Sequence, residues 1–150
     1  MKQLIILSAS LVLITTACTT LTLQPADFSW PVESALQVDD KGNISADRYS
    51  TNFNTIGLYF EEFQDSMAYK GKEVRLIRNN WGDYFITGKK FKNVYVFKAT
   101  EGKLEMESKI FISEFGLNEP AFNQRVPYIE LVDGDYKINL TSEGIEGGSK

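Results

Sequence analysis

The feature that most constrains this chain is a succession of short apolar and β-branched segments separated by turn residues. Between residues 35 and 143 these segments are only a few residues long, and Gly, Asn and Asp stand between them. Short strands with this spacing are typical of antiparallel all-β domains. The pattern predicts about eight or nine strands in a single antiparallel β-sandwich or small β-barrel, because a lone sheet leaves one face and two edges uncovered.

The clearest strand signals come after residue 70. Alternating or β-branched runs flank a turn at residues 80–83, and two further runs flank Asp133-Gly134-Asp135, which is a strong hairpin signal. Consecutive strands joined by such turns form a meander. The strands predicted here are residues 72–79, 84–87, 93–97, 104–107, 110–112, 128–132 and 136–140.

The earlier part of the domain carries weaker signals. Gly42 and Asn43 accept positive φ, so residues 39–43 predict a hairpin between the segments on either side. Residues 56–63 alternate apolar side chains and therefore predict a strand. Helix content is expected to be low, with a turn or two near residues 61–69 or within residues 113–123.

The amino terminus has the layout of a signal peptide. Lys2 supplies positive charge, and residues 4–14 form an uncharged apolar run. As a helix this run would reach about 17 Å at roughly 1.5 Å per residue, whereas the hydrocarbon core of a bilayer is about 30 Å thick. The run is therefore too short to span a membrane as a permanent anchor.

Residues 15–18, Thr-Thr-Ala-Cys, resemble the lipobox of bacterial lipoproteins, although Thr15 stands where that family usually carries an aliphatic residue. The resemblance implies cleavage before Cys18, a diacylglycerol on its sulfur and membrane anchoring through that lipid. Thr19 implies the outer membrane if the cell has two. The alternatives are an ordinary signal peptide that contains a cysteine and an uncleaved hydrophobic end. Cys18 is the only cysteine of 150 residues, so it has no partner for an internal disulfide.

These signals divide the chain into four parts. Residues 1–17 are the expected signal peptide, residues 18–34 a lipid-anchored tether, residues 35–143 one β-domain and residues 144–150 a flexible tail. The formal net charge of the chain is −4. An acidic chain of this kind argues against nucleic acid as a partner.

The composition also removes most catalytic chemistry. The chain has no histidine, which excludes Ser-His-Asp and Cys-His arrangements and the commonest zinc ligand. Lipid on Cys18 would leave no thiol nucleophile. Glu105 and Glu107 share one face of a predicted strand, and a solvated strand face explains them. We therefore expect no enzyme, no cofactor and no metal site.

One segment is predicted as a binding element. Residues 114–127 form an unusually long connection between two predicted strands, and long connections in compact domains often bind partners. The alternative is a crossover that places Phe122 in the core and Arg125 in an ion pair. The candidate binding residues of this connection are Phe115, Phe122, Asn123, Gln124 and Arg125.

Aromatic side chains offer a second kind of site. Trp81, Tyr84, Tyr95 and Tyr128 would form a stacking platform for glycan rings if at least two share one exposed face. The leading functional hypothesis is a non-catalytic envelope lipoprotein that binds an envelope protein as an accessory or scaffold subunit. The alternatives are a lipoprotein that binds a glycan or small ligand, and a histidine-free hydrolase.

Overall fold

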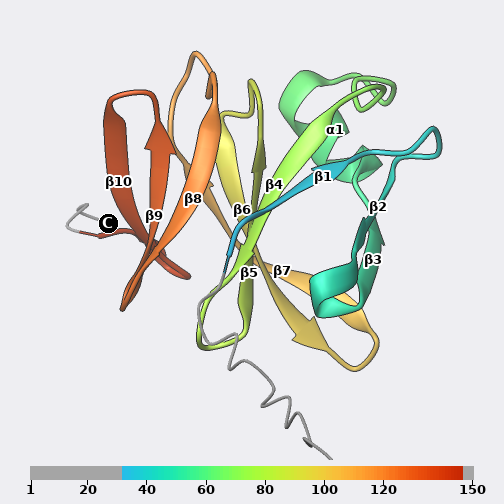
Figure 1. Cartoon of the computed structure of the whole chain (residues 1–150). Helices are drawn as coiled ribbons and strands as arrows, with labels where there is room; N and C mark the ends of the chain where they lie inside the picture. Colours follow the sequence, from blue (N-terminus) through green and yellow to red (C-terminus); the bar gives the residue numbers. More distant parts are fainter. Residues whose placement is uncertain (1–31, 147–150) are drawn as a thin grey trace, which may run out of the picture.

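A computed structural model describes residues 32–146, which form an all-β sandwich (Figure 1). These residues contain eleven strands and one α-helix, and every strand pair is antiparallel. The strands form three open sheets, so the sandwich is confirmed in preference to a closed barrel. Residues 1–31, with the predicted signal peptide and Cys18, lie outside the described residues.

The central sheet has five strands in the order β1-β4-β5-β6-β7. Its last four strands are the predicted meander of consecutive hairpins. For the last of these, the sequence predicted two strands, at residues 104–107 and 110–112. The structure has one continuous strand, which contains a bulge opposite Val96 and Phe97. The strands are β1 (Ser34–Gln37), β4 (Glu73–Arg78), β5 (Asp83–Gly88), β6 (Asn93–Thr100) and β7 (Lys103–Phe111).

A four-stranded sheet, in the order β11-β10-β9-β8, packs on one face of the central sheet. Its strands are β8 (Pro120–Arg125), β9 (Tyr128–Asp133), β10 (Tyr136–Thr141) and β11 (Gly144–Ile145). The two sheets enclose one apolar core. That core comprises Ile77, Phe85, Val94, Val96, Ile110, Leu117, Phe122, Ile129, Leu131 and Leu140.

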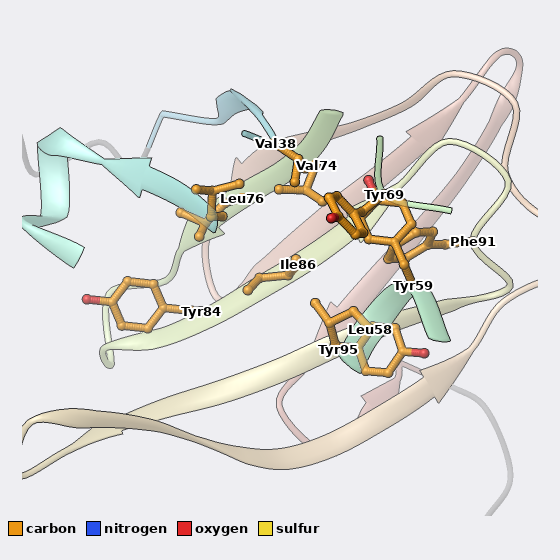
Figure 2. Close-up of a cluster of buried hydrophobic side chains, with 11 residues drawn as sticks. Val38, Leu58, Tyr59, Tyr69, Val74, Leu76, Tyr84, Ile86, Phe91 and Tyr95 are labelled. Atoms are coloured by element: carbon orange, nitrogen blue, oxygen red, sulfur yellow. The ribbon is translucent and has the colours of Figure 1, made fainter. Parts of the chain in front are cut away.

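The other face of the central sheet is covered by the first part of the domain. This cover consists of β2 (Asn43–Ala46), the 3₁₀ turn η1 (Asp47–Tyr49), β3 (Thr51–Asn54) and the helix α1 (Ile56–Phe63). Figure 2 shows the second core that forms beneath it. Its buried residues are Val38, Ile44, Leu58, Tyr59, Tyr69, Val74, Leu76, Tyr84, Ile86, Phe91 and Tyr95.

Strand alternation explains why the central sheet serves both cores. On β5, Tyr84 and Ile86 face the core beneath α1, whereas Phe85 faces the four-stranded sheet. All six residues of this strand are buried. A strand buried on both faces reads as a nearly continuous apolar run, which is the pattern found at residues 84–87.

Residues 56–63 form α1, so the predicted strand at this position is wrong. The side-chain oxygen of Asn54 accepts the Ile56 N–H at 3.0 Å and satisfies one unpaired donor of the first turn. Helical spacing buries Leu58 and Tyr59 together and brings Phe63 against Tyr59, with ring centroids 6.0 Å apart. The two-residue alternation in this segment was therefore coincidental.

The predicted hairpin around residues 39–43 is also wrong in its pairing. The turn exists, because Asp39 Oδ1 accepts the N–H groups of Lys41 and Asn43 at 2.8 and 2.7 Å. However, β1 pairs with β4, and β2 pairs with β3. The turn carries the chain from the central sheet into the layer that covers it.

Two further boundaries differ from the predictions. Residues 120–125 of the expected long connection form β8, which pairs with β9. Residues 144–145, placed in the flexible tail by the sequence, form β11 against the end of β10. The sequence also did not predict β3, whereas the segments that form β1 and β2 were expected on either side of the 39–43 turn. The described residues contain eleven strands in all. No helix within residues 32–146 is long and apolar enough to cross a membrane.

Candidate functional site

The predicted binding residues of the 114–127 segment do not form one surface. Phe122 is only 3% exposed and belongs to the core between the sheets. Asn123 donates to Glu130 at 3.0 Å, and Arg125 forms an ion pair with the same carboxylate at 3.6 Å. These two contacts lower the pKa of Glu130, the Asn123 hydrogen bond most. The crossover interpretation therefore describes Phe122 and Arg125 correctly.

The remaining two residues of that set point in different directions. Phe115 is 90% exposed on the connection that precedes β8. Gln124 has both side-chain polar atoms buried, and neither has a hydrogen-bond partner among the residues that the structure describes. Phe115 precedes β8, and Arg125 is the last residue of that strand.

Glu33, the residue before β1, contacts the outer edge of β8. Glu33 accepts the Phe122 N–H at 2.8 Å and forms an ion pair with Arg75 at 3.3 Å. Pro120, near the other end of the strand, has no N–H. Occupied or missing donors of this kind discourage pairing with another strand.

Exposed apolar side chains also lie on α1 and β7. On α1, Phe60 is 51% exposed and Phe63 is 37% exposed. On β7, Met106 is 52% exposed and Phe111 is 55% exposed. Glu61 and Lys109 join the two elements through an ion pair of 2.5 Å. We call these four apolar residues the α1–β7 surface.

The same region contains an open groove of about 520 Å³. Phe53, Leu58, Phe97, Leu104 and Met106 supply much of its apolar lining. Glu61 and Lys103 contribute charged groups to its wall. A groove with apolar walls and a charged border suits an inserted apolar side chain of a second molecule.

The helix beneath this surface is fixed to the sheet by Glu62. Its carboxylate accepts the Lys92 N–H at 2.7 Å, the Asn93 amide at 2.8 Å and the Tyr95 hydroxyl at 2.8 Å. Burial of Tyr95, together with its hydrogen bond to Glu62, raises the pKa of this phenol. Charge-assisted bonds to three groups hold α1 in place, so the apolar residues above it are presented by a fixed element.

A second hollow lies at the end of the sandwich where β4 turns into β5. We call it the Trp81 cleft, and its volume is about 550 Å³. Trp81 and Tyr128 both line it, whereas Tyr84 and Tyr95 are core residues. The structure therefore brings together two of the four aromatic residues that the sequence named. The polar groups around them come from Asn79, Asp83, Lys98, Thr141, Ser142 and Glu143.

The turn that presents Trp81 is built by one side chain. Asn79 Oδ1 accepts the N–H groups of Trp81 and Asp83 at 3.0 and 2.8 Å, and Asn79 Nδ2 donates to Asp83 at 2.9 Å. Gly82 adopts φ +97°, which glycine allows without strain. Trp81 is consequently 64% exposed on an ordered turn.

The sequence did not identify the α1–β7 surface, because residues 56–63 and Met106 fitted strand alternation. Within residues 32–146 no group of three or more acidic or cysteine side chains is arranged to hold a metal ion. Glu105 and Glu107 are in ion pairs with Lys103 and Lys98 on the outside of β7. Comparison of the chain with protein-family models, with curated proteins and with solved structures found no match.

Proposed function

We propose that this protein is a non-catalytic, lipid-anchored envelope protein that binds another envelope protein as an accessory or scaffold subunit. The α1–β7 surface is the observation that carries the proposal. Large apolar side chains are exposed on a fixed helix and on the strand that the Glu61–Lys109 ion pair joins to it. Such side chains are costly to leave in water, and exposed apolar patches mark interaction sites in soluble domains. The aromatic residues and Met106 are also of the types enriched at protein interfaces.

The chemistry of the patch suggests the kind of partner. Phe60, Phe63 and Phe111 offer three rings for packing, and the groove beside them accepts a protruding apolar side chain. The ion pair between Glu61 and Lys109 crosses the same region. A partner with an apolar centre and a polar border therefore fits this surface.

The position of β1 is compatible with an anchored domain. β1 begins beside the end of β4 that leads into the 79–83 turn, since Ser34 pairs with Leu76 and Gln37 with Glu73. Glu62 of α1 contacts Asn93, at the other end of β5 and β6 (Figure 1). A tether from residue 18 to residue 32 spans at most about 50 Å at roughly 3.5 Å per residue. The end of α1 that holds Glu62 is thus turned away from the attachment point.

The lipid anchor is tested by the variant Cys18→Ser. We expect the unmodified protein in the membrane fraction and the variant in the soluble envelope fraction, because two acyl chains suffice for stable anchoring. Immunoblots of fractionated cells measure the distribution. Equal membrane partition of both proteins would contradict the lipid anchor.

The protein partner is tested by crosslinking in intact cells, followed by affinity purification and mass spectrometry. The variant is Phe60→Ser/Phe111→Ser, and the matched control is Tyr136→Ser, which changes an exposed aromatic residue on β10. We expect one envelope protein to be recovered with the unmodified chain and the control and to be lost with the double variant. Recovery of that protein at the same yield from the double variant would exclude the α1–β7 surface, and recovery of none from the unmodified chain would overturn the proposal.

A further inference from the structure

We infer that the Trp81 cleft is a binding site for a neutral oligosaccharide. It is separate from the α1–β7 surface, since none of the four residues of that surface lines it. The inference therefore does not rest on the proposed protein partner. It rests on the shape of the cleft, its aromatic walls and the charge of its polar groups.

The aromatic walls supply the first argument. Trp81, on the turn between β4 and β5, and Tyr128, at the start of β9, line the same hollow. A tryptophan that is 64% exposed leaves a large flat apolar area in water. The C–H faces of a pyranose ring are flat and apolar, so they cover such a ring while the sugar hydroxyls remain directed outward to polar partners.

The polar groups supply the second argument. Asp83 is 5% exposed, and its carboxylate is oriented by Asn79, so the cleft contains an acceptor fixed before any ligand arrives. The Lys98 ammonium group and the Ser142 hydroxyl add donors along the same wall, whereas the Thr141 hydroxyl donates to the Gly144 carbonyl at 3.2 Å. Binding sites of this type combine apolar contact area with a few placed polar groups that fix the orientation of the ligand.

The charge of the cleft selects among sugars. Asp83 and Glu143 contribute two carboxylates and Lys98 one ammonium group, so the lining is acidic. An acidic lining disfavours uronic acids, sialic acids and phosphorylated chains through like-charge repulsion. The ligand class that remains is a neutral oligosaccharide of a few rings.

The test uses the lipidated chain in detergent micelles with Trp30→Phe. The chain has two tryptophans, so this variant leaves Trp81 as its only indole fluorophore. The probes are N,N′,N″-triacetylchitotriose and maltotriose as neutral sugars and trigalacturonic acid as an acidic one. We expect a saturable fluorescence change with one neutral trisaccharide in the micromolar to millimolar range, and at least ~10-fold weaker binding of trigalacturonic acid.

Variants locate the site. Tyr128→Ala should weaken the binding by ~10-fold, which corresponds to about 1.4 kcal/mol, whereas Tyr136→Ala should leave it unchanged. Calorimetry with Trp81→Ala, in which the fluorophore is absent, should detect no binding. Circular dichroism confirms that each variant is folded.

Three results would overturn the inference. These are the absence of a response to every sugar, equal affinity of Tyr128→Ala and the unmodified chain, and a Trp81 response to phosphatidylethanolamine vesicles alone. The last result would identify Trp81 as a membrane contact. None of them bears on the crosslinking experiment at the α1–β7 surface, so the two proposals fail independently.

Discussion

Gly116 shows how a single residue determines the path of the connection after β7. It adopts φ +73°, and a Cβ built on it would lie 2.5 Å from the backbone oxygen of Lys90. The chain passes so closely because Lys90 N–H donates to the Leu117 carbonyl and Leu117 N–H donates to the Phe91 carbonyl. Only glycine satisfies both the backbone conformation and the contact.

Gly116→Ala should lower the free energy of unfolding by about 3 kcal/mol, because strain at positive φ adds to a collision with backbone that cannot move aside. The matched control is Gly102→Ala, at φ +76° with open space around the added methyl group. That control should cost about 1 kcal/mol, from backbone strain alone. Urea denaturation followed by circular dichroism measures both, and equal losses would show that the Lys90 contact has no energetic weight.

A candidate-site residue could be predicted from the sequence where neighbouring residues determine its position. The turn at residues 79–83 follows from its Asn, Gly and Asp residues, and Trp81 is exposed because it lies within that turn. Tyr128 was predicted, with Trp81, for an aromatic stacking platform, and the two residues line one cleft. Tyr95 was named as well but is a core residue, because which side of a strand is covered depends on elements far away in the sequence.

At the scale of elements, α1 illustrates what a short helix needs from its surroundings. A helix of eight residues is unstable by itself in water, so its existence depends on packing. The contacts come from residues about thirty positions later, where Glu62 meets Lys92, Asn93 and Tyr95. No local pattern announces such a contact.

The same distinction between local and long-range contacts separates the strands that were predicted from those that were not. The meander from β4 to β7 and the hairpin of β9 and β10 were predicted because each is closed by its own turn. β8 was missed because its partner β9 follows a tight connection at residues 126–127 that the sequence joined to a longer loop. The pairing of β1 with β4 crosses more than thirty residues and has no turn to signal it.

Glu62→Ala should lower the free energy of unfolding by about 3 kcal/mol, because the donors of Lys92, Asn93 and Tyr95 lose a charged acceptor. The adjacent variant Glu61→Ala is the control. It removes an exposed ion pair with Lys109 and should cost less than about 1 kcal/mol. Chemical denaturation at neutral pH compares them, and a Glu61→Ala loss as large as that of Glu62→Ala would refute the role given to Glu62.

At the scale of the whole molecule, the central sheet joins two cores. Its middle strands contribute to both, so neither cover can pack without it. The Glu33 carboxylate also connects the five-stranded sheet to the four-stranded sheet. Glu33 contacts Arg75 on β4 and Phe122 on β8, and its burial raises its pKa above the ordinary value of 4.5.

This shift predicts the pH dependence of stability. The folded protein holds the Glu33 proton more tightly than the unfolded chain does, so ionisation of Glu33 lowers the free energy of unfolding as pH rises from 4.5 through the raised pKa. Glu33→Gln does not titrate and should lack this decline. Urea midpoints of both proteins between about pH 4 and pH 7 give the difference, and parallel curves would mean that burial does not shift the titration of Glu33.

The position of β1 at the edge of the central sheet, paired with β4, has a mechanical consequence. With an anchor at Cys18 and a partner on the α1–β7 surface, tension between the two would draw β1 lengthwise past β4. The four residue pairs between Ser34–Leu76 and Gln37–Glu73 would then resist in shear together, instead of opening one after another as in peeling. Glu33 meets the force first, through its bonds to both large sheets. A tether that continued from Glu33 towards Cys18 would therefore load β1 in shear, the direction in which a strand is hardest to extract.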